Sequence, residues 1–141
     1  MKALALDVGS KTIGLAGSDA LGITAQPITT VRRTNLKADL AAVKAVIAER
    51  EVTHLIVGLP LNMNGTEGPS AEEARKIGDA LSTPDLTVIY WDERMTTVAA
   101  QRSLLESNVS RKKRREVVDQ VAAVLILQGW LESRPAPEPY D

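Results

Sequence analysis

Cysteine and phenylalanine are absent from the 141-residue chain, and aromatic residues make up only 3% of it. Without cysteine the protein has no disulfides, no thiolate metal ligands and no thiol nucleophile. Hydrophobic residues still amount to 44%. The core must therefore consist of Ala, Val, Leu and Ile, in a chain of the length of one ordinary domain. The aromatic residues are too few and too scattered for a base-stacking platform: Tyr90, Trp91, Trp130 and Tyr140.

An excess of one charge is also missing, because the formal net charge is only -1. Bulk electrostatics therefore does not indicate a nucleic-acid-binding protein, and any anion site must be local. No apolar run approaches the ~20 residues that span a bilayer, and no charged leader with a cleavable apolar segment opens the chain. We expect a soluble cytoplasmic protein with no membrane partner.

The hydrophobic pattern predicts strands first and then an alternation of helices and strands. Three consecutive strands with short connections favour an antiparallel meander, and Pro27 favours an edge position for the third. This order predicts a mixed sheet with helices on its faces, over residues 1–133, followed by an extended, mobile Pro-rich tail at 134–141. The expected elements are strands at 2–8, 12–18 and 23–32, a helix capped by Asn35, a strand at 54–58, a helix opened by a Ser70–Glu73 capping box, a strand at 86–91, and helices at 97–107 and 116–132.

Acidic residues interrupt apolar segments at three places. Asp7 ends the first strand, the pair Asp92 and Glu93 ends the last one, and Asp119 lies on a helix that is apolar nearly all round. Burying carboxylates together costs several kcal/mol unless something pairs them. A divalent cation would do so, and oxygen ligands suit Mg²⁺ or Mn²⁺.

Each of these residues also has an ordinary structural explanation. An Asp at a strand end is usually a turn former or a cap, and Asp119 could complement the dipole of its helix. The dipole does not explain Ala122 and Ala123 one turn later, which are small enough to let that helix face lie close to a sheet. We therefore interpret the acids together as a metal-binding cluster, whereas His54 has no second histidine with which to share a metal and is interpreted as structural.

Basic residues close to these acids suggest local phosphate contacts. Gly9 allows a sharp turn beside Asp7, so that Lys11 could reach a phosphate held by the metal, although D-V-G-S-K-T-I-G lacks the spacing of a Walker loop. Five cations also directly precede the helix of Asp119, where they oppose the helix dipole. A solvated loop is the common reading of such a run, and we favour phosphate binding for its members: Arg111, Lys112, Lys113, Arg114 and Arg115.

Four segments carry a resemblance to a known family: D-V-G-S-K-T-I-G-L-A-G-S-D, I-V-G-L-P-L-N-M-N-G-T-E-G-P, D-E-R-M-T-T-V-A-A and V-D-Q-V-A-A-V-L-I-L-Q. In this order they resemble the YqgF/RuvX family of ribonuclease H-like proteins, which is related to Holliday junction resolvases. The resemblance implies an α/β fold with three layers and a five-stranded mixed sheet of order 3-2-1-4-5, in which strand 2 is antiparallel. It also implies a metal-dependent phosphodiesterase site.

The resemblance assigns the acids by motif. Asp7 matches the acid of the family's first strand, and Asp119 matches the acid of its last helix. The remaining acid lies in D-E-R, where Asp92 and Glu93 both stay open. We favour Glu93, because the fifth strand lies two strand spacings, about 9–10 Å, from the first and a longer side chain crosses that gap more readily. In related resolvases the second acid ends the fourth strand, but here that strand ends in Gly58-Leu59-Pro60.

The function implied by the resemblance is metal-assisted hydrolysis of a phosphodiester by one or two ions, at the 5′ end of pre-16S ribosomal RNA. Lys11 and Arg94 are expected to neutralise phosphate charge, and Asn62 with the loop at Gly65 to position the strand. The substrate would be structured or single-stranded RNA, with a Holliday junction in branched DNA as the alternative, and the protein a monomer or a homodimer. A non-catalytic RNA-binding factor of ribosome assembly is a further alternative. An ATP-binding protein of the actin-like class is disfavoured, because that class uses two such domains.

Overall fold

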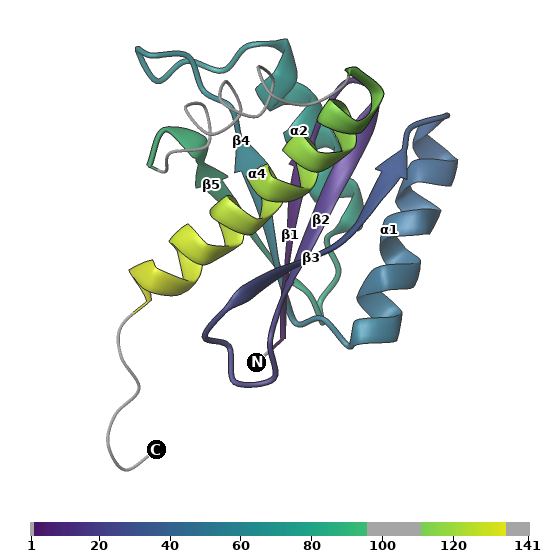
Figure 1. Cartoon of the computed structure of the whole chain (residues 1–141), viewed down its shortest axis with the longest axis vertical. Coiled ribbons are helices and arrows are strands. Elements are labelled where there is room, and N and C mark those ends of the chain that lie inside the picture. Colours follow the sequence, from purple (N-terminus) through teal and green to yellow (C-terminus); the bar gives the residue numbers. More distant parts are fainter. Residues whose placement is uncertain (1, 96–110, 135–141) are drawn as a thin grey trace.

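The computed structural model of the chain describes residues 2–95 and 111–134, and of residues 111–119 only the backbone. This part of the chain forms a five-stranded sheet of order β3-β2-β1-β4-β5 (Figure 1). Since β1 pairs antiparallel with β2 and parallel with β4, the sheet is mixed, as the resemblance implied. The elements are β1 (Ala3–Val8), β2 (Thr12–Ser18), β3 (Ala25–Arg32), α1 (Leu36–Arg50), β4 (His54–Leu59), α2 (Pro69–Leu81), β5 (Thr87–Asp92), the 3₁₀ turn η1 (Glu93–Met95) and α4 (Arg111–Ser133).

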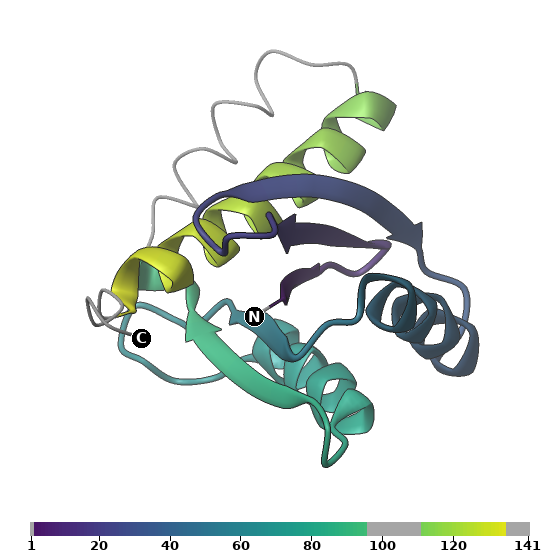
Figure 2. The same ribbon diagram turned by 90° about the horizontal axis from the view of Figure 1, so that it is seen from below.

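Helices cover both faces of the sheet, and the sheet divides the hydrophobic core into two clusters. Figure 2 shows α1 and α2 on one face and α4 on the other. Side chains alternate along β1, so that Leu4 and Leu6 join the cluster under α1 and α2, whereas Ala3 and Ala5 pack against α4. Alanine on the α4 side lets that helix approach the sheet closely.

Local sequence signals account for several element boundaries. Asn35 Oδ1 accepts a hydrogen bond from Ala38 N at 2.8 Å, which caps α1 as predicted. The strand that contains Pro27 lies at the edge of the sheet, where its missing N–H costs no ladder hydrogen bond. The predicted helix over 97–107 lies outside the described residues, as does the predicted tail at 134–141 except for Arg134. None of the described helices combines the length and the apolar character that crossing a bilayer requires.

Two predicted helix starts are wrong. The N-cap of α2 is Gly68, without a side-chain cap, and Pro69 is the first helical residue, so the Ser70–Glu73 capping box does not form. The helix α4 begins at Arg111 rather than at residue 116, and the cationic run belongs to the helix instead of preceding it. Lys and Arg are good helix formers, so residues 111–115 can form the first turn of α4.

Candidate active site

Asp7 lies between two glycines on the face of the sheet that α4 covers. Gly14 of β2 is its antiparallel partner. On the other side, the parallel register that pairs Leu6 with Val57 brings Gly58 beside Asp7. Residues side by side in a sheet point to the same face, so neither neighbour places a side chain against the carboxylate. The Asp7 side chain is nevertheless buried, with 6% of its residue surface exposed.

Glu93 reaches the same place from the end of β5. It is also buried, and its Cγ lies 3.3 Å from the position that a Cβ on Gly58 would occupy. Gly58 is about one strand spacing, ~4.8 Å, from Asp7. The Glu93 side chain therefore lies over the strand that separates β5 from β1, which is the crossing expected of the longer acid.

The Asp92 carboxylate is hydrogen-bonded to Arg94. It accepts hydrogen bonds from Arg94 N at 2.9 Å and from Arg94 Nη2 at 2.8 Å. The hydrogen bond from the Arg94 guanidinium holds the pKa of Asp92 below its ordinary value. This geometry favours Glu93 over Asp92 as the acid that faces Asp7, while its role as a metal ligand stays a prediction.

Arg94 and Asn62 shape the loop between β4 and α2. Arg94 Nη1 donates to Met63 O at 3.1 Å, and Asn62 O accepts from Gly65 N at 2.8 Å. Gly65 has φ +84°, a left-handed conformation that favours glycine, and a Cβ there would lie 3.6 Å from the Arg94 guanidinium. Lys11 is exposed in the turn between β1 and β2. The phosphate contacts expected of Lys11, Asn62 and Arg94 remain predictions.

The helix α4 runs along the sheet above Asp7. Gln120 Nε2 donates to Thr30 Oγ1 at 2.8 Å, and Thr30 pairs with Gly14, the partner of Asp7. Near its other end Gln128 Oε1 accepts from Ala25 N at 3.1 Å. These two contacts place the turn of α4 at residue 120 at the level of Asp7.

The third predicted acid belongs to this turn. Helical spacing places position 119 on the same side of α4 as Ala122 and Ala123, which are buried against the sheet. The side chain of Asp119 lies outside the described residues, as do those of the cationic run at 111–115. Among the side chains that are described, no three of His, Cys, Asp and Glu gather as a metal site. The structure thus brings Asp7 and Glu93 together, and Asp119 as the third member stays a prediction.

The family described as "RuvX: Holliday junction resolvase" matches residues 1–133. The chain belongs to the RuvX family. It is similar to a protein of Myxococcus xanthus named "Putative pre-16S rRNA nuclease", with 61% identity over 139 residues, which are 98% of this chain and 92% of that protein. A protein of the same name from Moorella thermoacetica is 56% identical over 133 residues, 94% of this chain and 95% of its own.

Solved resolvase structures share the architecture of this RuvX-family chain. The fowlpox virus Holliday junction resolvase superposes with a TM-score of 0.58 at 14% identity, covering 95% of this chain and 100% of that one. RuvC of T. thermophilus, in complex with a Holliday junction substrate, gives a TM-score of 0.56 at 12% identity and 92% coverage of each chain. At these identities the likeness shows the fold, which is ribonuclease H-like, as the resemblance implied.

Sequence reasoning missed two polar atoms on the α4 face of this RuvX fold. Thr12 Oγ1 and Trp91 Nε1 are buried and have no hydrogen-bond partner among the described residues. Trp91 pairs with Gly58, two strands from Asp7. Thr12 stands closer, on the strand next to β1. Alternation along β2 could have placed Thr12 on this face, but the lack of a partner is visible only in three dimensions.

Arg33 is the other residue that the sequence did not reveal. Its guanidinium donates to Gly9 O at 3.0 Å, to Asp39 Oδ2 at 3.2 Å and to Glu73 Oε1 at 2.6 Å. Burial alone would lower the pKa of Arg33, but the hydrogen bonds to Glu73 and Asp39 raise it. Arg33 therefore ties the turn that follows Asp7 to the starts of α1 and α2.

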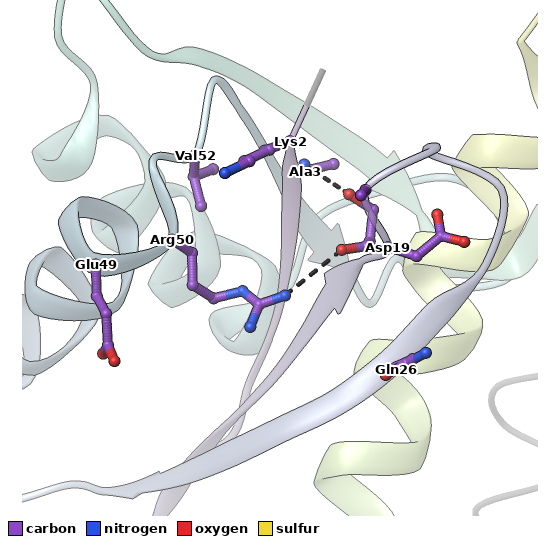
Figure 3. A pocket seen from close by; sticks show the side chains of 9 residues that line it. Lys2, Ala3, Asp19, Gln26, Glu49, Arg50 and Val52 are labelled. Atoms are coloured by element: carbon purple, nitrogen blue, oxygen red, sulfur yellow. Dashed lines mark hydrogen bonds between the residues drawn. The ribbon is translucent and has the colours of Figure 1, made fainter.

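Cavities lie at both ends of the sheet. One of about 290 Å³ adjoins the turn after Asp7, and it is lined by Val8, Gly9, Ser10, Pro69, Ser70 and Glu73. A larger one of about 440 Å³ lies at the opposite end, where Arg50 Nη2 donates to Ser18 O at 3.5 Å (Figure 3). Lys2, Asp19 and Glu49 also line this larger cavity. Cavity volume alone therefore does not point to the buried acids.

Proposed function

We propose that this RuvX-family chain is a nuclease that uses Mg²⁺ or Mn²⁺ to hydrolyse a phosphodiester at the 5′ end of pre-16S ribosomal RNA. The observation that carries the proposal is a buried Asp7 between two glycines, with the buried Glu93 side chain lying over one of them. Family membership and the names of the similar proteins support the reaction and the substrate.

The residues at this place fit a hard divalent cation. Carboxylate oxygens are the ligands that Mg²⁺ and Mn²⁺ prefer, and the missing side chain of Gly58 lets the Glu93 side chain pack over the strand beside Asp7. Buried polar groups are normally hydrogen-bonded. The Thr12 hydroxyl has no such partner among the described residues, which supports a polar occupant on this face.

In the mechanism we propose, Asp7, Glu93 and Asp119 would hold the metal, and the metal would supply a lowered pKa for an attacking water and charge stabilisation for the leaving oxygen. The short Asp7 side chain, on the central strand of the sheet, would hold the metal at the centre of the site. Glu93 reaches in from the side, and α4 shields the site from bulk water above. Lys11 and Arg94 would neutralise phosphate charge, and the products would be a 5′-phosphate and a 3′-hydroxyl.

The Arg94–Met63 contact supports a second task for the loop after β4. Because the Arg94 guanidinium is held by Asp92 and by Met63 O, the loop that contains Asn62 keeps a defined position next to Glu93. A nucleic-acid strand that crosses the end of the sheet would meet this loop on one side. On the other side it would meet the exposed Lys11 in the turn after Asp7.

The test is cleavage of two substrates of matched length, a pre-16S leader RNA and a four-way DNA junction, with Mn²⁺ present and absent. We expect metal-dependent cutting of the RNA, and Asp7→Asn should lower the rate by about 10⁴-fold while the protein stays folded. Asp19→Asn, at the opposite end of the sheet, is the matched control and should leave the rate unchanged.

Other outcomes would redirect the proposal. Preferential cutting of the four-way DNA, which the family's description favours as the second candidate, would identify a resolvase; symmetric cutting then requires a dimer, which the mass in solution reveals. RNA binding without cleavage, unchanged by loss of the acids, would identify a non-catalytic assembly factor. Full activity of Asp7→Asn would remove the central assignment.

A further inference from the structure

Thr12 carries a buried hydroxyl that no described residue hydrogen-bonds. The residue is 5% exposed, and Oγ1 has no hydrogen-bond partner among the described residues. A buried polar group without a partner costs free energy, and valine would suit a strand equally well. The hydroxyl therefore indicates an additional partner.

The position of Thr12 points to that partner. Gly14 pairs with Asp7, and Ala16 packs in the cluster under α4, so the alternation along β2 puts Thr12 on the same face as Asp7. Thr12 is the diagonal neighbour of Asp7 across the β1–β2 ladder, at a general Cα separation of about 7–8 Å. At this separation, one water molecule can bind an ion held by the Asp7 carboxylate and also hydrogen-bond the Thr12 hydroxyl.

We propose that Thr12 is a positioning residue of the cation site, whose hydroxyl hydrogen-bonds a water ligand of a divalent cation held by Asp7. The inference rests on the proposed function, because it takes the cation from there. Groups that orient metal ligands from behind typically change metal affinity by about 10–100-fold when they are removed. Thr12 would thereby help to fix one coordination position next to the turn at Gly9.

The ordinary alternative is a threonine retained for its β-branched shape. Two substitutions separate the explanations: Thr12→Val keeps the shape without the hydroxyl, and Thr12→Ser keeps the hydroxyl without the shape. Thr29→Val provides the matched control, because Thr29 pairs with Leu15 and so faces the other side of the sheet.

The experiment measures Mn²⁺ affinity of the full chain by titration calorimetry, without nucleic acid, together with thermal unfolding in a chelator. We expect Thr12→Val to weaken Mn²⁺ binding by about 10-fold or more, Thr12→Ser by less than about 3-fold, and Thr29→Val not at all. In the chelator Thr12→Val should unfold at the same temperature as the wild type or higher, since it loses a hydroxyl without a partner.

Two results would overturn the inference, in different ways. If the wild type binds Mn²⁺, Asp7→Asn abolishes the binding and Thr12→Val binds as well as the wild type, then the role of Thr12 is refuted while the cation site stands. If Asp7→Asn does not change Mn²⁺ binding, the cation site of the proposed function fails, and the inference fails with it. Should Thr12→Val not fold, Thr12→Ala replaces it and is judged by the same affinities.

Discussion

Strand β2 carries a buried hydroxyl at each of its two ends, and the two are treated differently. At the end where β1 starts, Ser18 Oγ accepts a hydrogen bond from Ala3 N at 2.9 Å. At the end where β1 finishes, Thr12 Oγ1 has no partner among the described residues. Both residues are buried to a similar extent, at 7% and 5% exposure. We call the first the opposite end and the second, which holds Asp7, the acid end.

Cavity volume distinguishes the two ends in the opposite sense. The larger cavity, of about 440 Å³, lies at the opposite end. There Arg50 Nη2 donates to Ser18 O, and Ser18 Oγ accepts from Ala3 N. The smaller one, of about 290 Å³, lies beside the acid end. Hydrogen-bonded polar groups such as Ser18 add to stability at the opposite end. At the acid end, burial of two acids and of a hydroxyl that has no partner among the described residues reduces stability. The Thr12 hydroxyl, which has no partner among the described residues, therefore points to the acid end, whereas cavity volume does not.

Comparing Glu93→Gln with Asp92→Asn tests which of the two acids acts with Asp7, and its expected effect is the largest after that of Asp7→Asn. We expect Glu93→Gln to lower the Mn²⁺-dependent cleavage rate by about 10³-fold or more, because it removes a charge that faces Asp7. Asp92→Asn should cost less than about 10-fold, since Asp92 acts through Arg94. Single-turnover cleavage of the RNA measures both, with unfolding in a chelator as the check on folding. A larger loss for Asp92→Asn would reverse the assignment of the middle acid.

Local signals explain how far sequence reasoning reached in the fold. The bounds of β2, the Asn35 cap and the edge position of Pro27 were predictable because each depends on residues adjacent in the chain. The start of α2 was not, because Glu73 finds Arg33 rather than its own helix end. The strand order followed from the family resemblance and not from the pattern, since periodicity does not say which strands become neighbours.

The same distinction holds for the candidate site. Asp7 and Glu93 end strands that run parallel, so their convergence was predictable, and the register then showed Gly58 between them. Thr12 was missed because the lack of a hydrogen-bond partner for its hydroxyl among the described residues depends on how distant segments pack. Arg33 was missed because its three acceptors come from separate segments of the chain. No sequence pattern encodes a missing hydrogen bond.

Arg33→Ala should have the next largest effect, and it acts on stability. It would leave the buried carboxylate of Asp39 without its cation and release Gly9 O, for which we expect a loss of about 3 kcal/mol in the free energy of unfolding. Arg50→Ala, at the opposite end, is the matched control; Arg50 is exposed, so its loss should stay near about 0.5 kcal/mol. Urea unfolding compares the two, and equal losses would contradict a special role for Arg33.

Ser18→Ala tests whether the two buried hydroxyls of β2 have different roles. It removes the acceptor of Ala3 N in a buried place, so we expect a loss of about 1–2 kcal/mol in the free energy of unfolding. The cleavage rate per folded molecule should stay at the wild-type value. Thr12→Val is the counterpart at the acid end and should show the reverse pattern, with the free energy of unfolding kept and Mn²⁺ affinity lowered. The same pattern from both variants would show that the two hydroxyls are equivalent.

The smallest expected effect is the pH dependence of the opposite end, where His54 begins β4. Its ring lies 5.8 Å from that of Trp130, centroid to centroid, and Nδ1 shares a hydrogen bond of 2.9 Å with Thr53 Oγ1. Burial lowers the pKa of His54 from 6.5, and the charge of Arg134 lowers it further. The unfolded chain therefore binds a proton on this residue more readily than the folded protein does.

The sign of the effect follows from this difference. The stability due to a neutral His54 is fully present above pH about 6.5, and it is lost as the pH falls from there through the lower pKa of the folded state. His54→Asn should lose less stability than the wild type between pH 7.5 and 5.5 in urea unfolding, and the difference between the two isolates His54 from the carboxylates. The pH profile of cleavage, corrected for the folded fraction, should be the same in both proteins. A profile that shifts with His54→Asn would show that protonation at the opposite end reaches the acids, and the two ends could then no longer be treated as independent.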